Sequence, residues 1–490
     1  MNLKHIAETA LVAVLLATVG CGTALSEGPY QATGIKIGEV TDSSAIVWTR
    51  LTQRSERIGS EAPMPKVFYR DPETGTKSER RGSGRPDRKP LVEFRDGSTI
   101  ETIEGAVPGA AGKVKVFYKA ADAADWESTG WLSVDANRDY TRQFRLTGLQ
   151  SNARYQVRVE PRSDSGAVIE GGFKTAPSPD ESERVVFTVS TGQAYPDQDA
   201  VGGGYKIYAA MLKLDPSFFV HTGDIVYYDK LAKSLPLARW HWSRMYSLPT
   251  NVEFHRRVAS YFIKDDHDTW MNDCWPSRKT SFMGDFTFEQ GLAVFREQVP
   301  MGDRTWRTFR WGRDLQVWLV EGRDYRSANT MPDGPDKTIW GRKQKEWFKR
   351  TVRESDATFR FLISPTPVVG PDRSNKHDNH SNKDFQHEGN DIRQFISKQK
   401  NMYVICGDRH WQYVSVDKDT GVREYSCGPA SDKHAGGWSD DKRYPEHQYL
   451  NVIGGFLAVT VDRFQGKPAV ILRHHGVDGD VLNEDRFSAR

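Results

Sequence analysis

Apolar and polar residues alternate in short runs over the first third of the chain. Clean alternation appears at residues 35–37, 45–47 and 113–120, and it returns three times between residues 141 and 176. Alternation with a period of two, broken by polar turns, indicates β-strands that bury one face. Several such strands in succession predict a β-sandwich. Residues 54–112 interrupt the pattern and are rich in proline, glycine and arginine, so we predict an insertion of low order, in which only "KVFYR" and "LVEFR" suggest a hairpin.

Strands and helices alternate after residue 184. Short runs that are apolar throughout indicate buried strands, and they lie at 184–191, 217–224, 261–268, 359–368 and 402–411. Helical periodicity appears between them, at 202–216, 285–299 and 341–355. This order predicts an α/β sandwich with its site along one sheet edge. We therefore expect a β-sandwich domain over 26–178 and an α/β domain over 179–490.

The first 25 residues predict a secretory signal peptide. Lys4 and His5 precede an apolar run from Ala10 to Val19, which is followed by small residues. Two cleavage sites fit: one before Cys21, which would then carry a lipid, and one after Ala24. The run is short for a membrane span. We expect an exported protein that is periplasmic, secreted or lipid-anchored at the cell envelope.

Length, charge and cysteine content narrow the picture. A chain of 490 residues is too long for one core of ordinary size, which supports two domains. Its 68 basic and 65 acidic side chains nearly balance, so no nucleic-acid-binding signature appears. Besides Cys21, the chain holds Cys274, Cys406 and Cys427, with no paired CxxC motif. We expect buried thiols, with a Cys406–Cys427 bridge left open if their strands are neighbours.

Four strand ends carry dense polar clusters. They are "STGQAYPD" at 190–197, "HTGDIVYYD" at 221–229, "KDDHDTWMND" at 264–273 and "CGDRHWQY" at 406–413. Carboxylates that converge on one sheet edge repel one another and need a cation. Hard oxygen ligands with an imidazole suit iron, manganese, calcium or magnesium. The sequence therefore predicts a metal centre.

Three of these blocks resemble the signature of the alkaline phosphatase D (PhoD-like) family, within the calcineurin-like metallophosphoesterases. The matching residues are Gly223-Asp224 with Tyr227, Asp265-Asp266-His267 with Asn272, and Gly407-Asp408 with His410. Looser matches are "VEGRDYR", with Glu321 at the family's aspartate position, the helix at 341–355, and Trp48-Thr49-Arg50 in the first domain. The resemblance spans residue 34 to the C-terminus, without the insertion. It implies a four-layer α/β/β/α sandwich preceded by a small fibronectin type III-like domain.

The resemblance also implies roles for single residues. Asp224 would bridge two metal ions, Tyr227 would bind Fe³⁺, and Asn272 would bind the second metal, which is Ca²⁺ in the family. Asp408 and His410 would complete the ligands. The implied reaction is the hydrolysis of phosphate mono- or diesters by a metal-activated water. The physical chemistry agrees, because a shared carboxylate holds two cations together and such a pair acidifies a bound water.

The sequence departs from the family at one ligand. The family's first strand ends in Ser-Cys-Gln, where the cysteine binds iron, whereas this chain has Thr191-Gly192-Gln193. Glycine offers no ligand, which leaves the identity of the first metal open. Gln193 and Asp197 are candidates for a substitute oxygen. The polar stretch 370–393 is either a solvated surface loop or a lid that reaches the site with a histidine such as His380 and with Asp372 or Arg373.

Two further residues have alternative roles. His267 either donates a proton or contacts the phosphate, or it serves as a hydrogen-bond support behind the site. Arg323 either holds the substrate phosphate through a bidentate pair or forms a structural ion pair with Glu321 or Asp324. A non-catalytic binding protein on the same fold is the alternative function, but buried acids without a cation would be costly. A metal-dependent esterase or lipase is a further alternative, and it is disfavoured because no Gly-x-Ser-x-Gly turn joins a strand to a helix.

Overall fold

The computed structural model describes residues 28–79, 88–163 and 167–490. Its largest sheet has nine strands. In spatial order they are β24 (Val481–Ser488), β23 (Lys467–His475), β22 (Phe456–Phe464), β12 (Val185–Ser190), β13 (Phe218–His221), β14 (Ala259–Phe262), β1 (Ile35–Gly38), β2 (Ser44–Arg50) and β9 (Thr141–Thr147). The central strands β12, β13 and β14 are parallel and buried at every position, as expected for apolar runs that are covered on both faces.

A second sheet of seven strands faces the first. Its spatial order is β15 (Arg307–Trp311), β16 (Leu315–Leu319), β17 (Phe359–Ser364), β18 (Met402–Cys406), β20 (Arg423–Cys427), β19 (Gln412–Val416) and β21 (His447–Asn451). One hydrophobic cluster lies between the two sheets. Within it Phe187 stacks on Phe218 at 4.8 Å and meets Phe361 of the opposite sheet edge-on at 5.5 Å.

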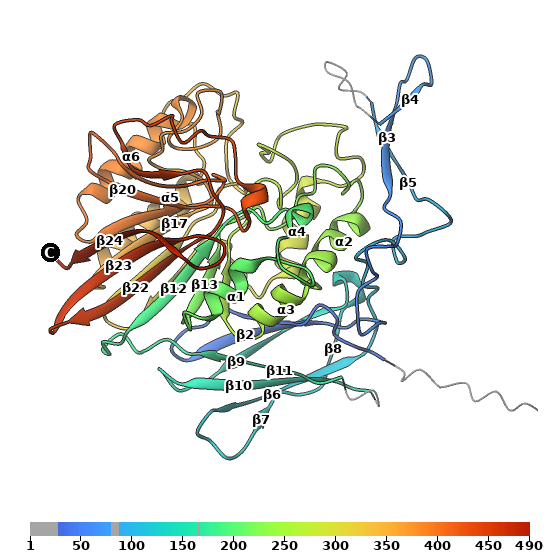
Figure 1. The fold of residues 1–490 in the computed structure, drawn as a ribbon, viewed down its shortest axis with the longest axis horizontal. Coiled ribbons are helices and arrows are strands. Elements are labelled where there is room, and N and C mark those ends of the chain that lie inside the picture. The colour runs from blue at the N-terminus through green and yellow to red at the C-terminus, as the bar shows by residue number, and fades with distance from the viewer. Residues whose placement is uncertain (1–27, 80–87, 164–166) are drawn as a thin grey trace, which may run out of the picture.

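Helices cover the outer face of each sheet (Figure 1). The next residue along β13, Phe219, points away from Phe218 and into the helical layer. The first sheet is covered by α1 (Lys206–Leu212), α2 (Leu235–Tyr246), α3 (Pro249–His255) and α4 (Phe288–Gln298). The second is covered by α5 (Gly341–Glu354) and α6 (Gln386–Ser397). The layers therefore run α/β/β/α, which confirms the fold class expected from the sequence.

The N-terminal strands form a sandwich that shares a sheet with the rest of the chain. One layer consists of β11 (Ile169–Lys174), β10 (Arg154–Pro161), β6 (Lys113–Ala120), β7 (Glu127–Ser128) and β8 (Leu132–Ser133). The other layer is β1, β2 and β9, and β1 continues into β14 through the pair Gly38 and Ser260. A Cβ on Gly38 would lie 2.4 Å from the Ser260 carbonyl oxygen, so only glycine allows this approach. Residues 26–178 and 179–490 are thus joined through one sheet.

The insertion is more ordered than its composition suggests. It contains a small sheet of β4 (Lys77–Ser78), β3 (Lys66–Arg70) and β5 (Pro90–Glu93), which includes the suggested hairpin pair. Ile103 and Ala106 pack against Leu237 and Trp240 of α2. The expectation of low order is therefore wrong for residues 54–79 and 88–112, because a few apolar residues spaced among polar ones suffice to anchor them.

Stretch 370–393 is not a solvated loop. Asp378, Asn379 and His380 are fully buried, and the segment leads through a short turn (Lys383–Phe385) into α6. His380 bonds Glu388 at 3.0 Å and meets Trp340 edge-on. The surface-loop interpretation is wrong for this part of the stretch, because Asp378 and His380 are buried beside charged partners, Arg323 and Arg409 for Asp378 and Glu388 for His380.

The cysteines at 274, 406 and 427 are buried free thiols. Cys406 lies opposite Ser426 in the β18–β20 pair, so the bridge that the sequence left open does not form. The expected signal peptide lies outside the described residues. Among the helices of the described ranges, none has the length and apolar character of a membrane span.

Candidate metal centre

The four polar blocks meet at one edge of the fold, after the ends of β12, β13, β14 and β18. Two of them turn through unusual backbone: Asp224 has φ of 55° and Asp408 has φ of 63°. Left-handed backbone is uncommon outside glycine and is concentrated at functional sites. A Cβ on Gly223 would lie 2.6 Å from the Cβ of Asp265, so glycine is needed for the two loops to touch. The Gly-Asp pairs therefore serve close packing as well as delivering a carboxylate.

One group of ligand atoms gathers around the Tyr227 hydroxyl. This hydroxyl lies 3.2 Å from Asp224 Oδ2, 3.3 Å from His410 Nε2 and 2.6 Å from His434 Nε2. His410 Nε2 in turn lies 3.2 Å from Asp224 Oδ2. The structure thus brings Asp224, Tyr227 and His410 together, and it adds His434, which the sequence analysis did not select.

A second group of ligand atoms shares Asp224. One ligand atom each from Asp224, Asp266 and His267 lies within 4.8 Å of the others. Asn272 is exposed at the rim, where its backbone N–H donates to Asp229 at 2.7 Å. Asp408 is paired with Arg409, and the like charge of Asp266 lies close enough to raise the pKa of Asp408. Asp224 therefore stands between the two groups, which is the position that the sequence predicts for it.

The electrostatics of the site call for cations. Burial raises the pKa of Asp224 to about 7, and the neighbouring Asp266 adds to the shift. Burial likewise raises the pKa of Asp408 to about 7, with Asp378 adding to it. Asp224 Oδ1 is buried without a hydrogen-bond partner among the described residues. A metal ion would supply both the missing partner and the missing positive charge, so the residues fit a metal centre.

His267 is held by a carboxylate behind it. Its Nδ1 contacts Asp229 Oδ2, and its ring lies 4.5 Å from the Tyr227 ring between centroids. Burial alone would lower the pKa of His267, but the charges of Asp229, Asp266 and Asp224 outweigh it and raise the pKa well above its ordinary value. The carboxylates around His267 thus favour its protonated form, and Nε2 is the ring nitrogen that does not contact Asp229.

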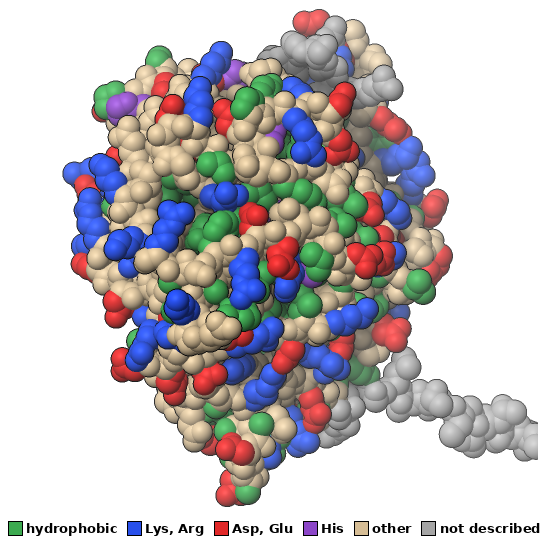
Figure 2. Space-filling view, turned by 60° about the vertical axis from the view of Figure 1, so that its left-hand side comes forward, with side chains coloured by type: hydrophobic (Ala, Val, Ile, Leu, Met, Phe, Trp, Pro, Cys, Tyr) green, Lys and Arg blue, Asp and Glu red, His purple; other side chains and the backbone are tan. Residues whose placement is uncertain are grey.

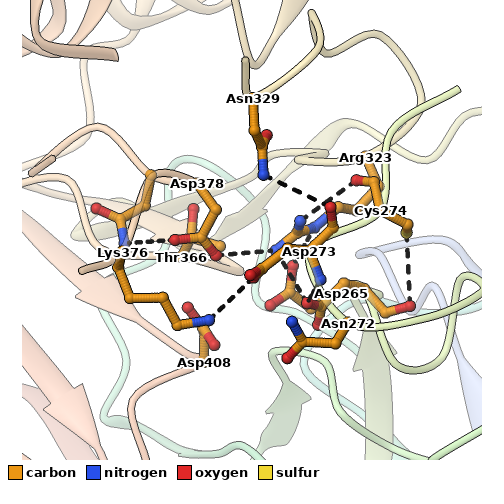
Figure 3. Close-up of polar contacts among 12 residues, drawn as sticks. Asp265, Asn272, Asp273, Cys274, Arg323, Asn329, Thr366, Lys376, Asp378 and Asp408 are labelled. Carbon is orange, nitrogen blue, oxygen red and sulfur yellow. Dashed lines mark hydrogen bonds and ion pairs between the residues drawn. The ribbon is translucent and has the colours of Figure 1, made fainter. Parts of the chain in front are cut away.

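Arg323 is buried in ion pairs rather than open to substrate. It is fully buried, and its Nε donates to Asp265 Oδ1 at 2.6 Å. Figure 3 shows it beside Asp265 and Cys274, with Asp378 on its far side. The direct phosphate role is therefore wrong for this geometry. Arg323 does form an ion pair, but its partner is Asp265 and not Glu321 or Asp324. Those two carboxylates both accept from Lys264 at 2.6 Å.

Stretch 370–393 brings Lys376 and Arg373 to the site, where burial lowers the pKa of His410 and the charge of Arg373 adds to the shift. Lys376 Nζ donates to Asp273 Oδ1 at 2.9 Å and points to the side where Asp408 lies (Figure 3). Arg409, a further cation here, is fully buried and pairs with Asp372 at 3.2 Å. The structure thus agrees better with the lid interpretation than with the surface-loop interpretation. The side chains of this stretch that reach the site are cations such as Lys376, and not a histidine.

The three additional candidates have other partners. Gln193 is fully buried, and its Oε1 accepts from Tyr208 at 2.7 Å, away from the metal ligands. Asp197 accepts from His434 Nδ1 at 2.8 Å. His380 bonds Glu388 within stretch 370–393. The structure does not place any of the three among the ligand atoms. His434 lies in a short turn (Asp432–His434) beyond the end of β20 at Cys427, and no local sequence pattern marks it as a site residue.

The fold and site define a metallophosphoesterase. The model of the PhoD-like phosphatase family matches residues 187–449, more than half of the chain, and the chain belongs to this family. Its structure is similar to that of PhoD, with a TM-score of 0.69 and 16% identity over 95% of this chain and 90% of that one. It is also similar to the purple acid phosphatase PPD1 from yellow lupin (Lupinus luteus) seeds, with a TM-score of 0.56 and 13% identity over 94% of this chain and 75% of that one. No curated protein sequence matches the chain.

These likenesses add to the site geometry in different ways. The two solved structures share the fold of this chain, and sequence identities of 13–16% support a common fold alone. Family membership makes the chain a phosphoesterase hydrolase that acts on phosphate esters and uses metal ions. The residues that hold those ions, the identity of the metals and the preferred ester remain proposals.

Proposed function

We propose that this protein is an exported alkaline phosphatase or phosphodiesterase of the D type, and that it accepts phosphodiesters at least as well as monoesters. One observation carries the proposal: the buried Asp224 carboxylate lies between two sets of ligand atoms and has an unpartnered oxygen. A shared carboxylate of this kind is what a two-metal hydrolytic site needs.

The two sets of ligands favour different ions. Tyr227 and His410 would hold Fe³⁺ together with Asp224, since phenolate and imidazole suit iron. Asp266, Asn272 and Asp408 offer only oxygen and would hold Ca²⁺. Burial raises the pKa of Tyr227 well above its ordinary value, so the phenol must lose its proton when the metal binds. Bound metal ions supply the Lewis acid that polarises the phosphoryl group and activates water.

His267 and Asp229 do the proton chemistry. The charge of Asp229, which is not a metal ligand, favours the protonated form of His267, and Nε2 would deliver that proton to the leaving oxygen of the ester. Asp229 fixes the ring through Nδ1 and fixes the backbone of Asn272 through its other oxygen. The Asp229 carboxylate therefore orients the proposed acid, His267, and supports the proposed metal ligand Asn272.

The charges at the opening favour a singly charged phosphate. Lys376 beside Asp273 and Arg373 near His410 are the half-buried cations, whereas Arg323 and Arg409 are fully buried in ion pairs. A monoester carries two negative charges and a diester one. A site with few open cations gains little from the second charge, which supports the preference for diesters.

The location and the partners follow from sequence features. Residues 1–25 support export, with lipid attachment at Cys21 as one of two processing routes. Figure 2 shows basic and acidic side chains interspersed over one face, without a large field of one sign. This distribution supports a small phosphate ester, and not a nucleic acid, as the substrate.

The test combines metal analysis with two chromogenic esters. Purified protein is analysed for bound metals, and kcat/KM is measured for p-nitrophenyl phosphate and bis-p-nitrophenyl phosphate before and after chelation. We expect activity on both esters, at least equal for the diester, that is lost with the metals. Full activity after complete metal removal would contradict the proposal, and a strong monoester preference would contradict its second part.

A further inference from the structure

We propose that His434 is a ligand of the metal at the Tyr227 position, and that two imidazoles fill the place where the resemblance puts a cysteine. The inference rests on the proposed function, because it concerns the metal of the same site. It assigns that position a transition-metal ion held by Asp224, Tyr227, His410 and His434.

The first observation is the space around Gly192. A Cβ built on this residue would lie 3.0 Å from His410 Nε2 and 3.2 Å from His434 Cδ2. Gly192 also has φ of 45°, a conformation that disfavours any side chain. The missing side chain therefore does not leave a void, because both imidazole rings lie against the glycine, with 4.2 Å between their centroids.

The second observation is the orientation of the His434 ring. Its Nδ1 lies 2.8 Å from Asp197 Oδ2, and a carboxylate at neutral pH can only accept a hydrogen bond. Nδ1 therefore carries the hydrogen, and the lone pair of Nε2 points to the Tyr227 hydroxyl at 2.6 Å. A carboxylate behind a histidine is the usual support for a metal-binding imidazole. Asp197, a candidate ligand in the sequence, therefore does not contact the metal position itself but supports His434, which does.

The third observation is how firmly His434 is attached to the site. The Ala430 N–H donates to the Gly192 carbonyl at 2.9 Å, which ties the two loops directly. The two residues just before the histidine are also fixed, because Asp432 Oδ1 accepts from the Gly454 N–H at 3.0 Å and Lys433 Nζ donates to the Gln198 carbonyl at 2.7 Å. The segment that carries His434 is therefore held by hydrogen bonds that do not involve the metal.

The ligand set predicts the class of metal. Two imidazoles, a phenolate and a carboxylate suit a first-row transition ion, whereas calcium and magnesium prefer oxygen alone. The exchange of thiolate for imidazole also removes the oxidisable ligand from the site. The consequence is a centre that holds its transition metal without a cysteine.

The test titrates metal-free full-length protein with Co²⁺, whose visible absorption reports nitrogen ligation. We expect His434→Gln to lose the cobalt band at this site and to weaken binding by more than 100-fold. That loss exceeds the ~10–100-fold expected for Asp197→Asn, which removes only the support. His434→Gly should regain the band when free imidazole is added. The matched control is His387→Gln, which changes an exposed histidine on α6.

Each outcome is decisive for one claim. Unchanged cobalt affinity and an unchanged band in His434→Gln would overturn the inference, and so would a Gly192→Cys variant that binds Co²⁺ more tightly. If His434→Gln does not fold, judged by circular dichroism, Asp197→Asn decides, and equal affinity to the natural protein overturns the inference. If the natural protein hydrolyses esters and His434→Gln binds Co²⁺ as the natural protein does, this inference alone is contradicted. A natural protein that neither binds Co²⁺ nor hydrolyses esters contradicts the proposed function as well.

Discussion

Replacing Asp229 by asparagine separates proton donation from metal binding. Asparagine keeps an oxygen for the Asn272 N–H, which Asp229 accepts at 2.7 Å, but it removes the negative charge beside His267 Nδ1. Asp229 makes the largest charge contribution that raises the pKa of His267 against burial. The substitution therefore lowers this pKa, and at pH 8 fewer molecules carry the proton that the leaving group needs.

The size of the effect follows from the role of the acid. A positioned general acid contributes about 10²–10⁴-fold in rate, and each factor of ten corresponds to about 1.4 kcal/mol of barrier. Asp229→Asn should thus cost about 3–5 kcal/mol of transition-state stabilisation for esters with a poor leaving group. Because the pKa of His267 falls, the loss should grow as pH rises and shrink at low pH.

The assay compares two leaving groups. An alkyl ester needs protonation of its leaving oxygen, whereas a nitrophenyl ester leaves without help. We expect kcat for the alkyl ester to fall by at least ~100-fold, with a much smaller fall for the nitrophenyl ester and unchanged metal content. An equal loss on both esters would show that Asp229 acts through Asn272 and the metal. Normal activity on both would refute the role of His267 as the acid.

Three further changes test other parts of the site. Arg323→Met leaves the Asp265 carboxylate buried without its partner, so the free energy of unfolding should fall by about 3–5 kcal/mol; a urea unfolding curve equal to that of the natural protein would contradict the buried ion pair. If the first metal is ferric, Tyr227→Phe should abolish the visible phenolate-to-iron band, and a retained band would move Tyr227 off the metal. Thiol reagents should leave the native enzyme active, since Cys274 and the other two described cysteines are fully buried and burial raises the pKa of Cys274 to about 12; rapid inactivation of the folded enzyme would contradict this.

The sequence predicts the layers and the principal site residues for simple physical reasons. Apolar runs predict the buried strands, and several strand ends with dense polar clusters predict a site at the sheet edge. Asp224, Tyr227 and His410 are selected there through the resemblance of their blocks to the family signature. The sheet shared by the two domains could not be predicted from the sequence. The contact between β1 and β14 is a single close approach at Gly38, which no local pattern encodes.

The residues that the sequence analysis missed are defined only by distant contacts. His434 lies more than 200 residues from Tyr227, in a stretch without periodicity, and only the fold brings its ring to the metal ligands. The sequence leaves Arg323 between a substrate role and a structural ion pair, and only its burial against Asp265 decides for an ion pair. The buried polar residues of stretch 370–393 look solvated in the sequence because their charged partners lie far along the chain.

The most direct test of the account is Asp224→Asn, measured for bound metal and for kcat in the same preparation. The variant keeps the shape of the side chain but loses the charge that two cations would share. We predict that it loses several orders of magnitude in kcat together with metal occupancy, while its circular dichroism spectrum stays that of the folded protein. Near-normal kcat with full metal occupancy would contradict the claim that Asp224 is the centre of this site.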